Sequence, residues 1–444
     1  MSDKYLIKGG FVLTLGQRTA NHAEADVLVE NGVIAEVGAG LRARDAEQID
    51  ATHAIVMPGF VDTHRHVWKS LFRNMGESGD ESGLAVSSNV YGPSYQPEDV
   101  YAATLIGLLG AIEAGITTVV DWADISSGSD HVDAALEAHA DAGLRTVLVH
   151  AMPGWLEGQD DEKVSLRRLA ALQAKTGDSS TTIAYGPRDP VGSGLDRVAR
   201  DFANARELGM RVHTHVGADP AEKGVVAALG SRGLLGDDVT LIHCSHLDEA
   251  DLDAIATHKA GVSLAPSSEM ADGMGMPPIQ DLIDRGIRPG LGVDSERVAP
   301  GDIFAQMRAM NSVQHATLFD LKLAGKGGLA NLLTTREVIR FATVDGARAV
   351  GVGAVSGSLE VGKQADIVVL RTDRPNIWPI NDPIGAVVWG MDTSNVDWVL
   401  AGGVALMREG VLTADVARAR ELAISAQRGV AERAGLMAGT GPGS

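Results

Sequence analysis

The sequence predicts an α/β protein in which a (β/α)8 barrel is joined to a small β-sandwich domain built from both chain ends. Between residues 55 and 350, short runs rich in β-branched residues alternate with segments of helical period, a pattern typical of parallel βα units. Eight such runs, each followed by a helical segment, favour a closed barrel over a doubly wound sheet. The flanking segments contain short strands and hairpin turns, such as Asn31-Gly32 and Gly402-Gly403, which predict antiparallel pairing.

The barrel strands are predicted at eight short apolar runs, which are Val56–His66, Thr117–Asp121, Thr146–His150, Thr181–Tyr185, Arg211–His215, Thr240–Cys244, Val262–Ala265 and Pro289–Asp294. Between them, apolar residues recur at the spacing of one helix face. This spacing predicts helices at Tyr101–Glu113, Leu195–Leu208, Leu247–His258 and Asp302–Gln314.

The two ends of the chain predict the β-domain. Their short strand candidates are Lys4–Leu13, Asp26–Val29, Val33–Val37, Ile367–Leu370, Val387–Val388, Val396–Leu400 and Val404–Arg408. We therefore divide the chain into half of the β-sandwich at 1–56, the barrel at 57–350, the other half at 351–415, and a C-terminal helix and tail at 416–444.

Charge and composition exclude several classes of partner. The 444 residues carry 38 basic and 58 acidic side chains, a net charge of −20, so a nucleic-acid partner is not expected. No run of eighteen uninterrupted apolar residues occurs, which argues against a membrane partner. The N-terminus lacks the apolar stretch of a signal peptide, and the single cysteine, Cys244, has no partner for an internal disulfide. We therefore expect a cytoplasmic protein.

Histidines and one aspartate stand at the ends of four predicted strands. His64 and His66 form an HxH pair, in which residues two apart on a strand face the same side. His215 ends a second HxH, and His243 and Asp294 end two further strands. The carboxyl ends of barrel strands meet at one face, so these side chains converge. Nitrogen and oxygen ligands with an open position suit Zn²⁺, with Fe²⁺, Mn²⁺ or Co²⁺ as alternatives.

The chain resembles the amidohydrolase superfamily, whose fold is a TIM barrel. Within it, the similar branch holds S-adenosylhomocysteine/methylthioadenosine deaminases, guanine and cytosine deaminases and triazine hydrolases. The resemblance covers nearly the whole chain and rests on six segments, which are Pro58–His66, Glu113–Thr118, His243–Leu247, Gly292–Asp294, Ala342–Ala347 and Gly357–Asp366.

The resemblance implies a role for each strand-end residue. His64, His66, His215 and Asp294 resemble the metal ligands, and Asp294 would also accept the proton of the bound water. His243 resembles the histidine that positions or polarises the substrate. Two-metal relatives bridge their ions with a carboxylated lysine after strand four, but no lysine lies between positions 175 and 223. We therefore expect one divalent metal ion.

One position departs from the deaminase pattern. The similar deaminases carry HxxE after strand five, where the glutamate moves protons, but here Ala218 stands three residues after His215. Glu269, just beyond strand seven, is predicted to face the same mouth and to supply a catalytic carboxylate; the alternative is a loop residue satisfied by a neighbour. Asp219 and Glu222 have the spacing of a helix cap.

Three residues are predicted to bind substrate. Arg188 stands where the similar proteins carry a substrate-contacting histidine; the alternative is a salt bridge to Asp189, Asp219 or another loop acid. Trp68 belongs either to the pocket wall or to the core. Met270 lies in a methionine-containing, glycine-rich segment that forms either a pliable lid or part of the barrel rim.

These observations predict a metal-dependent hydrolase that cleaves a C–N bond other than a peptide bond. The resemblance implies that metal-bound hydroxide attacks an sp² carbon of a small heterocyclic or amide-like substrate. The alternative substrates are a urea, a carbamate, a thiocarbamate or a chloro-heterocycle, and a remote alternative is a non-catalytic barrel relative. A homo-oligomer, dimer or tetramer, is expected from the resemblance and from the apolar surface expected on Thr317–Leu333.

Overall fold

The computed structural model describes residues 4–16, 21–75, 87–125, 128–153, 162–177 and 180–435. Eight parallel strands pair in chain order and form the predicted (β/α)8 barrel. They are β6 (Phe60–Arg65), β7 (Ile116–Ala123), β8 (Arg145–Ala151), β9 (Thr181–Gly186), β10 (Val212–Val216), β11 (Val239–His243), β12 (Gly261–Leu264) and β13 (Gly290–Leu291). A parallel bridge between Arg65 and Asp294 brings the two ends of this sheet together.

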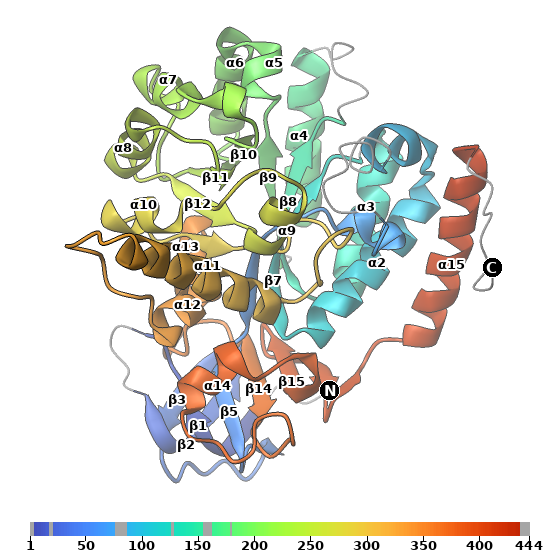
Figure 1. Ribbon diagram of the computed structural model, residues 1–444. Coiled ribbons are helices and arrows are strands. Elements are labelled where there is room, and N and C mark those ends of the chain that lie inside the picture. The colour runs from blue at the N-terminus through green and yellow to red at the C-terminus, as the bar shows by residue number, and fades with distance from the viewer. Residues whose placement is uncertain are drawn as a thin grey trace, which may run out of the picture.

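Helices follow the strands and surround the barrel (Figure 1). The longer ones are α2 (Pro97–Glu113), α3 (Ser129–Ala142), α4 (Glu162–Thr176), α6 (Leu195–Glu207), α8 (Glu249–His258) and α11 (Ile303–Leu323). The shorter ones include α5 (Pro190–Ser193), α7 (Val225–Ser231), α9 (Pro266–Ala271), α10 (Ile279–Asp284), α12 (Thr335–Phe341) and α13 (Val344–Ala349). The four predicted helices are present, but α11 continues beyond the predicted end at Gln314.

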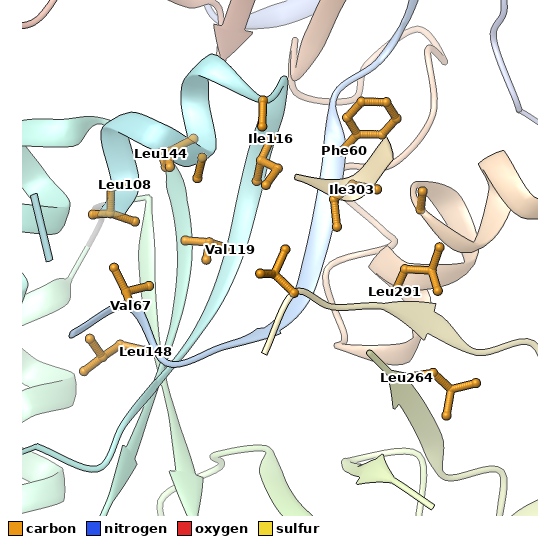
Figure 2. Close-up of a cluster of buried hydrophobic side chains, with 14 of the residues drawn as sticks. Phe60, Val67, Leu108, Ile116, Val119, Leu144, Leu148, Leu264, Leu291 and Ile303 are labelled. Carbon is orange, nitrogen blue, oxygen red and sulfur yellow. The ribbon is translucent and has the colours of Figure 1, made fainter. Parts of the chain in front are cut away.

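The main hydrophobic core lies between the outer face of the barrel and these helices. Figure 2 shows Ile116 and Val119 of β7, Leu148 of β8 and Leu264 of β12 among its buried side chains. Leu108 of α2 is fully buried in the same cluster. This packing fixes the strands, so their carboxyl ends present side chains in defined positions.

The predicted first barrel strand is two strands that belong to different sheets. β5 (Ala54–Pro58) pairs with strands from both chain ends, whereas β6 begins the barrel. Gly59 separates them, and a Cβ atom there would lie 2.2 Å from Cγ2 of Thr117. The close approach of the backbone to Thr117 therefore requires glycine at the point where the chain enters the barrel.

The β-domain expected from both chain ends is a single mixed sheet of nine strands. They are β1 (Lys4–Val12), β2 (His22–Glu30), β3 (Val33–Gly38), β4 (Glu47–Asp50), β5, β14 (Ile367–Arg371), β15 (Val396–Ala401), β16 (Val404–Arg408) and β17 (Val411–Leu412). Antiparallel pairing of β5 with β14 joins the two sets, and in Figure 1 the blue and orange strands lie side by side below the barrel.

One expectation about the C-terminal part is wrong, and the expected C-terminal helix is present. The predicted strand Val387–Val388 lies inside α14 (Pro383–Trp389), because Pro383 and the side chain of Asp382 start a helix there. The final helix, α15 (Val416–Arg433), returns to the barrel, where Gln427 donates a hydrogen bond to the carbonyl of Leu71. The expected tail beyond residue 435 lies outside the described residues.

Candidate metal centre

The predicted metal ligands lie at the carboxyl end of the barrel strands. His64 and His66 stand at the end of β6, His215 is in β10, His243 is the last residue of β11, and Asp294 follows β13. Four of these side chains are buried, and His215 is partly exposed. This is the face on which (β/α)8 enzymes carry their active sites.

Three distances between donor atoms match those expected around a single metal ion. Nε2 of His64 lies 3.2 Å from Nε2 of His215 and 3.4 Å from Oδ1 of Asp294. Nε2 of His66 lies 3.6 Å from the same oxygen. Ligands at about 2.1 Å from a tetrahedral Zn²⁺ are about 3.4 Å apart, so the residues fit a bound divalent ion. The donor of His243 also lies within 4.8 Å of those of His64 and His215.

The protonation states at this centre favour metal binding. Burial lowers the pKa of His64 to about 4 and that of His215 well below its usual value, so both rings are neutral near pH 7. Burial opposes ionisation of Asp294, but the hydrogen bond with His64 and the electrostatic effect of the neighbouring histidines outweigh it and hold its pKa well below the usual range. Neutral imidazoles and an ionised carboxylate are the forms that bind a metal.

The backbone is in an unusual conformation at two of these residues. His243 has φ +74° and Asp294 has φ +63°, the left-handed region that non-glycine residues rarely adopt. Each follows or ends a short strand, so the conformation aims the side chain at the centre of the barrel mouth. Backbone strain of this kind is typical of functional sites.

A buried ion pair holds β6 against the segment that carries Asp294. Oδ1 of Asp62 accepts hydrogen bonds from the backbone N–H of Val293 at 3.0 Å and of His64 at 3.4 Å. Nε of Arg65 lies 2.8 Å from Oδ2 of Asp62. The barrel closure and the ligand positions therefore depend on the same two buried charges.

His66 is oriented from behind by Asp124, a residue that the sequence analysis missed. Nδ1 of His66 lies 3.0 Å from Oδ1 of Asp124, and Nε1 of Trp68 donates to that oxygen at 2.7 Å. Trp68 itself is 1% exposed and packs edge-on against Tyr95, so it lies in the core and supports Asp124. Asp124 follows β7 directly. A search for polar residues at the ends of the predicted strands could therefore have found it.

Trp122 is a second residue without a sequence signal of its own. Its ring lies edge-on to His215, with 4.2 Å between the ring centroids, and 6.1 Å from the ring of His64. It is 6% exposed and lies in the cluster inside the barrel with Val120 and Val149. Trp122 therefore forms an apolar side of the metal centre.

Glu269 contacts His243. Oε1 of Glu269 lies 3.3 Å from Nδ1 of His243 and accepts a hydrogen bond from the backbone N–H of Ala265 at 2.8 Å. Its side chain is completely buried, so its carboxylate contacts the candidate centre through His243. The Glu269 hydrogen bond and the charges of Asp294 and Glu269 raise the pKa of His243, although burial opposes this change.

The other predicted residues lie farther from the donor atoms or have partners of their own. Nη2 of Arg188 forms an ion pair with Oδ1 of Asp201 at 2.7 Å, and Nε donates to the second oxygen at 3.1 Å. The salt-bridge alternative is thus present, but its acid is on α6. Met270, on α9, is 37% exposed.

The turn after β10 accommodates the absence of the HxxE glutamate. Ala218 is partly exposed there, and the carboxylate of Glu222 folds back to accept a hydrogen bond from the backbone N–H of Gly217. Asp219 caps the short helix that begins at Pro220, as predicted. A carboxylate therefore contacts this turn, but it belongs to Glu222.

Comparisons with known proteins agree with this geometry. A 5'-deoxyadenosine deaminase of Methanosarcina mazei is 30% identical over 421 residues, 91% of this chain and 93% of that protein. A 5-methylthioadenosine/S-adenosylhomocysteine deaminase of Pelotomaculum thermopropionicum is 28% identical over 423 residues, 91% and 93% of the two chains. The crystal structure of atrazine chlorohydrolase from Arthrobacter aurescens TC1 complexed with zinc superposes with a TM-score of 0.82 at 22% identity, covering 95% of this chain and all of that one.

The match to a protein family covers both the barrel and the strand through which the chain enters it. The amidohydrolase family matches residues 55–406. This range contains His64, His66, His215, His243 and Asp294. In the described part of the chain, no helix is both long and apolar enough to cross a membrane. With its barrel, its convergent donors and its curated relatives, the chain belongs to the amidohydrolase family and is a metal-dependent hydrolase acting on C–N bonds other than peptide bonds.

Proposed function

We propose that this protein uses one zinc ion to hydrolyse an exocyclic C–N bond at an sp² carbon of a small heterocyclic or amide-bearing molecule. The observation that supports the proposal most directly lies at the carboxyl end of the barrel, where the donor of His64 is within 4.8 Å of those of His66 and Asp294 in one group and of those of His215 and His243 in another. Three nitrogen donors and one carboxylate suit Zn²⁺.

The residues around the ion divide the work of proton transfer. When bound, the ion acidifies a water molecule and polarises the substrate. Asp294 is ionised at neutral pH, so its carboxylate can accept the proton of that water. Glu269 holds Nδ1 of His243 and leaves Nε2 for the substrate. We assign His243 to orienting and polarising the group under attack, and Glu269 to positioning His243.

Ala218 favours a second candidate reaction. A heterocyclic amine requires proton delivery to a ring nitrogen and to the departing amine, which is the role of the HxxE glutamate in the similar deaminases. Hydrolysis of a urea, a carbamate, a thiocarbamate or a chloro-heterocycle has less need of this step. Because alanine stands at this position, these substrates are the second candidate.

A panel of substrates tests both candidates. Zinc-loaded protein is incubated with heterocyclic amines, ureides, carbamates and chloro-heterocycles, and products are identified by mass together with release of ammonia or chloride. We expect turnover of at least one amine or amide-like compound. The matched control is Asp294→Asn, which should lower kcat by roughly 10²–10⁴. Turnover confined to ureides, carbamates or chloro-heterocycles would replace the first candidate by the second, and no turnover by zinc-loaded protein would overturn both.

We also propose that the chain forms a homo-oligomer. The end of α11 exposes Phe319, Leu321 and Leu323, and Leu323 is 86% exposed. The expected helical surface was Thr317–Leu333, but α11 ends at Leu323 and Leu332 lies in the following loop. Apolar side chains gathered in this way on a surface are typical of a subunit contact.

A further inference from the structure

A cavity of about 450 Å³ lies at the end of the barrel opposite the candidate metal centre. Its lining includes Arg145, the first residue of β8, Thr181, the first residue of β9, and Arg211, which directly precedes β10. Because the barrel strands are parallel, these residues lie at the amino ends of the strands, whereas the predicted metal ligands lie at the carboxyl ends. The cavity is therefore separate from the metal centre.

The lining of this cavity combines an apolar side with positive charge. Val147, Ala184 and Val350 line it and belong to the apolar cluster inside the barrel. Arg145 and Arg211 line it as well, and no aspartate or glutamate is among the described lining residues. A lining of this kind suits an anion that also has an apolar part.

Arg211 differs from Arg145 in having no acid as a partner. Nε of Arg145 forms an ion pair with Oδ2 of Asp366 at 2.9 Å. Within the described residues, the one hydrogen bond of Arg211 is a long one, from Nη2 to the carbonyl of Ala349 at 3.4 Å, and its Nε is enclosed without a partner. The side chain is partly buried, and a charge that leaves water without a partner is unfavourable.

The two acids closest in influence to Arg211 do not neutralise it by contact. Oδ2 of Asp238 forms an ion pair with Nε of Arg206 at 2.7 Å, and Asp237 is exposed and lines a neighbouring cavity. Burial lowers the pKa of Arg211, although the charges of Asp238 and Asp237 act in the opposite direction. A guanidinium group nevertheless stays charged in proteins, so the cation persists at the cavity wall.

The backbone at Gly351 holds the side chain of Arg211 in place. A Cβ atom at Gly351 would lie 2.4 Å from Cδ and 2.7 Å from Cζ of Arg211, so the arginine packs directly against this backbone. Gly351 has φ +83° and also lines the cavity. Packing of this kind fixes the guanidinium group before a ligand arrives, which reduces the entropic cost of binding.

We propose that this cavity binds a small organic anion, with a carboxylate or phosphate group at Arg211 and an apolar part against Val147, Ala184 and Val350. Both anionic groups accept charge-assisted hydrogen bonds from a guanidinium group. Sites for small molecules usually have volumes of about 300–1,000 Å³, and this cavity lies within that range. The binding site is additional to the hydrolytic site and does not require the metal ion.

The first experiment compares simple probes on the zinc-loaded wild-type protein by calorimetry. Benzoate is paired with neutral benzamide, and phenyl phosphate is paired with inorganic phosphate, which lacks the apolar part. We expect benzoate or phenyl phosphate to bind about tenfold or more tightly than its paired compound. The anion with the larger preference identifies the group as a carboxylate or a phosphate. Absence of a preference in both pairs would overturn the proposal.

The second experiment tests whether the anion is bound at Arg211. Arg211→Met removes the guanidinium group, and we expect it to weaken binding of the preferred anion about tenfold or more. Binding of benzamide should not change, and Arg211→Lys should restore part of the affinity. Zinc content is measured for each variant. Equal losses for the anion and for benzamide would assign Arg211 a structural role and contradict the proposal.

A third experiment changes the lining and leaves Arg211 in place. Val355 lines the cavity and is 42% exposed, so the fold should tolerate a polar side chain there. We expect Val355→Glu to weaken binding of the anion by charge repulsion and the matched Val355→Gln to leave it unchanged. Val361→Glu adds the same charge at an exposed valine outside this lining and should have no effect. Unchanged anion binding in either Arg211→Met or Val355→Glu would place the anion elsewhere, such as at the zinc ion, and overturn the proposal. If Arg211→Met does not fold, Val355→Glu decides.

Discussion

Asp124 and Trp68 set the orientation of one metal ligand without touching the ion's site themselves. Asp124 contacts Nδ1 of His66, and Trp68 donates to Asp124. Loss of such supporting hydrogen bonds lowers metal affinity by about 10- to 100-fold. We therefore expect Asp124→Asn and Trp68→Phe each to weaken zinc binding within this range, measured by competition with a chelator. Trp389→Phe, at a half-exposed tryptophan, should leave the affinity unchanged. Unaltered affinity in both test variants would contradict this role.

Glu269 is expected to act through His243. Because its carboxylate holds Nδ1 of His243 from a fully buried position, Glu269→Gln should lower kcat more than tenfold, which is at least ~1.4 kcal/mol in the barrier. Zinc content should stay unchanged. Ala218→Glu should not raise kcat on the native substrate. A Glu269→Gln enzyme with wild-type kcat would contradict the role of Glu269. An Ala218→Glu enzyme with clearly raised kcat would show that the site lacks the HxxE glutamate and has no replacement for it.

Among single residues, the sequence predicted best those that stand at the end of a barrel strand. His64, His66, His215, His243 and Asp294 were proposed from that rule, and their side chains converge in the structure. The environments of single residues were harder to predict. The partner of Arg188 is an acid on a helix face, and the carboxylate of Glu269 contacts His243. Such contacts depend on how loops and helices pack, which no local spacing encodes.

Glu296 connects the first barrel strand to the segment after the last one. It accepts hydrogen bonds from Ser70 and Arg73 and lies 3.7 Å from Nη1 of Arg65. Burial opposes its ionisation, but Arg65 and Arg73 outweigh this effect and lower the pKa of Glu296. A carboxyl group whose pKa is lowered by folding stabilises the fold above its unfolded pKa, and this contribution is lost as the pH falls.

We therefore expect Glu296→Gln to lower the free energy of unfolding by about 3–5 kcal/mol near pH 7, because it removes the buried carboxylate that faces both Arg65 and Arg73. The difference from wild type should be constant above about pH 5, near the end of the titration of an unfolded glutamate, and should shrink below about pH 4. Denaturant titrations across this range provide the measurement, with the exposed Glu207→Gln as control. A difference that does not change with pH would contradict the ionised network.

The alternation of strands and helices was predictable, because each element has its own period. The boundaries that depend on sheet membership were not. Residues 56–66 look like one apolar strand, and only pairing with β14 and β1 separates β5 from the barrel. Val387–Val388 has strand composition, but the helix start at Asp382 and Pro383 determines its structure. In both cases tertiary context overrides local propensity.

For the whole molecule, the apolar end of α11 predicts association. We expect light scattering at micromolar protein to return a multiple of 46.3 kDa, and Leu323→Glu to lower the mass by disrupting the contact. Arg420→Glu, on the surface of α15, provides a control that changes charge elsewhere. A mass near that of one chain for the wild-type protein would refute the proposal.

The central claim is that His64, His66, His215 and Asp294 bind one divalent ion, with His243 beside it. The most direct test is elemental analysis of the purified protein and of two variants. We predict one ion per chain in the wild type, loss of the ion in His64→Ala, and retention of the ion in His243→Ala with a kcat lowered by roughly 10²–10⁴. Two tightly held ions per chain, full retention by His64→Ala, or a metal-free His243→Ala would contradict the account.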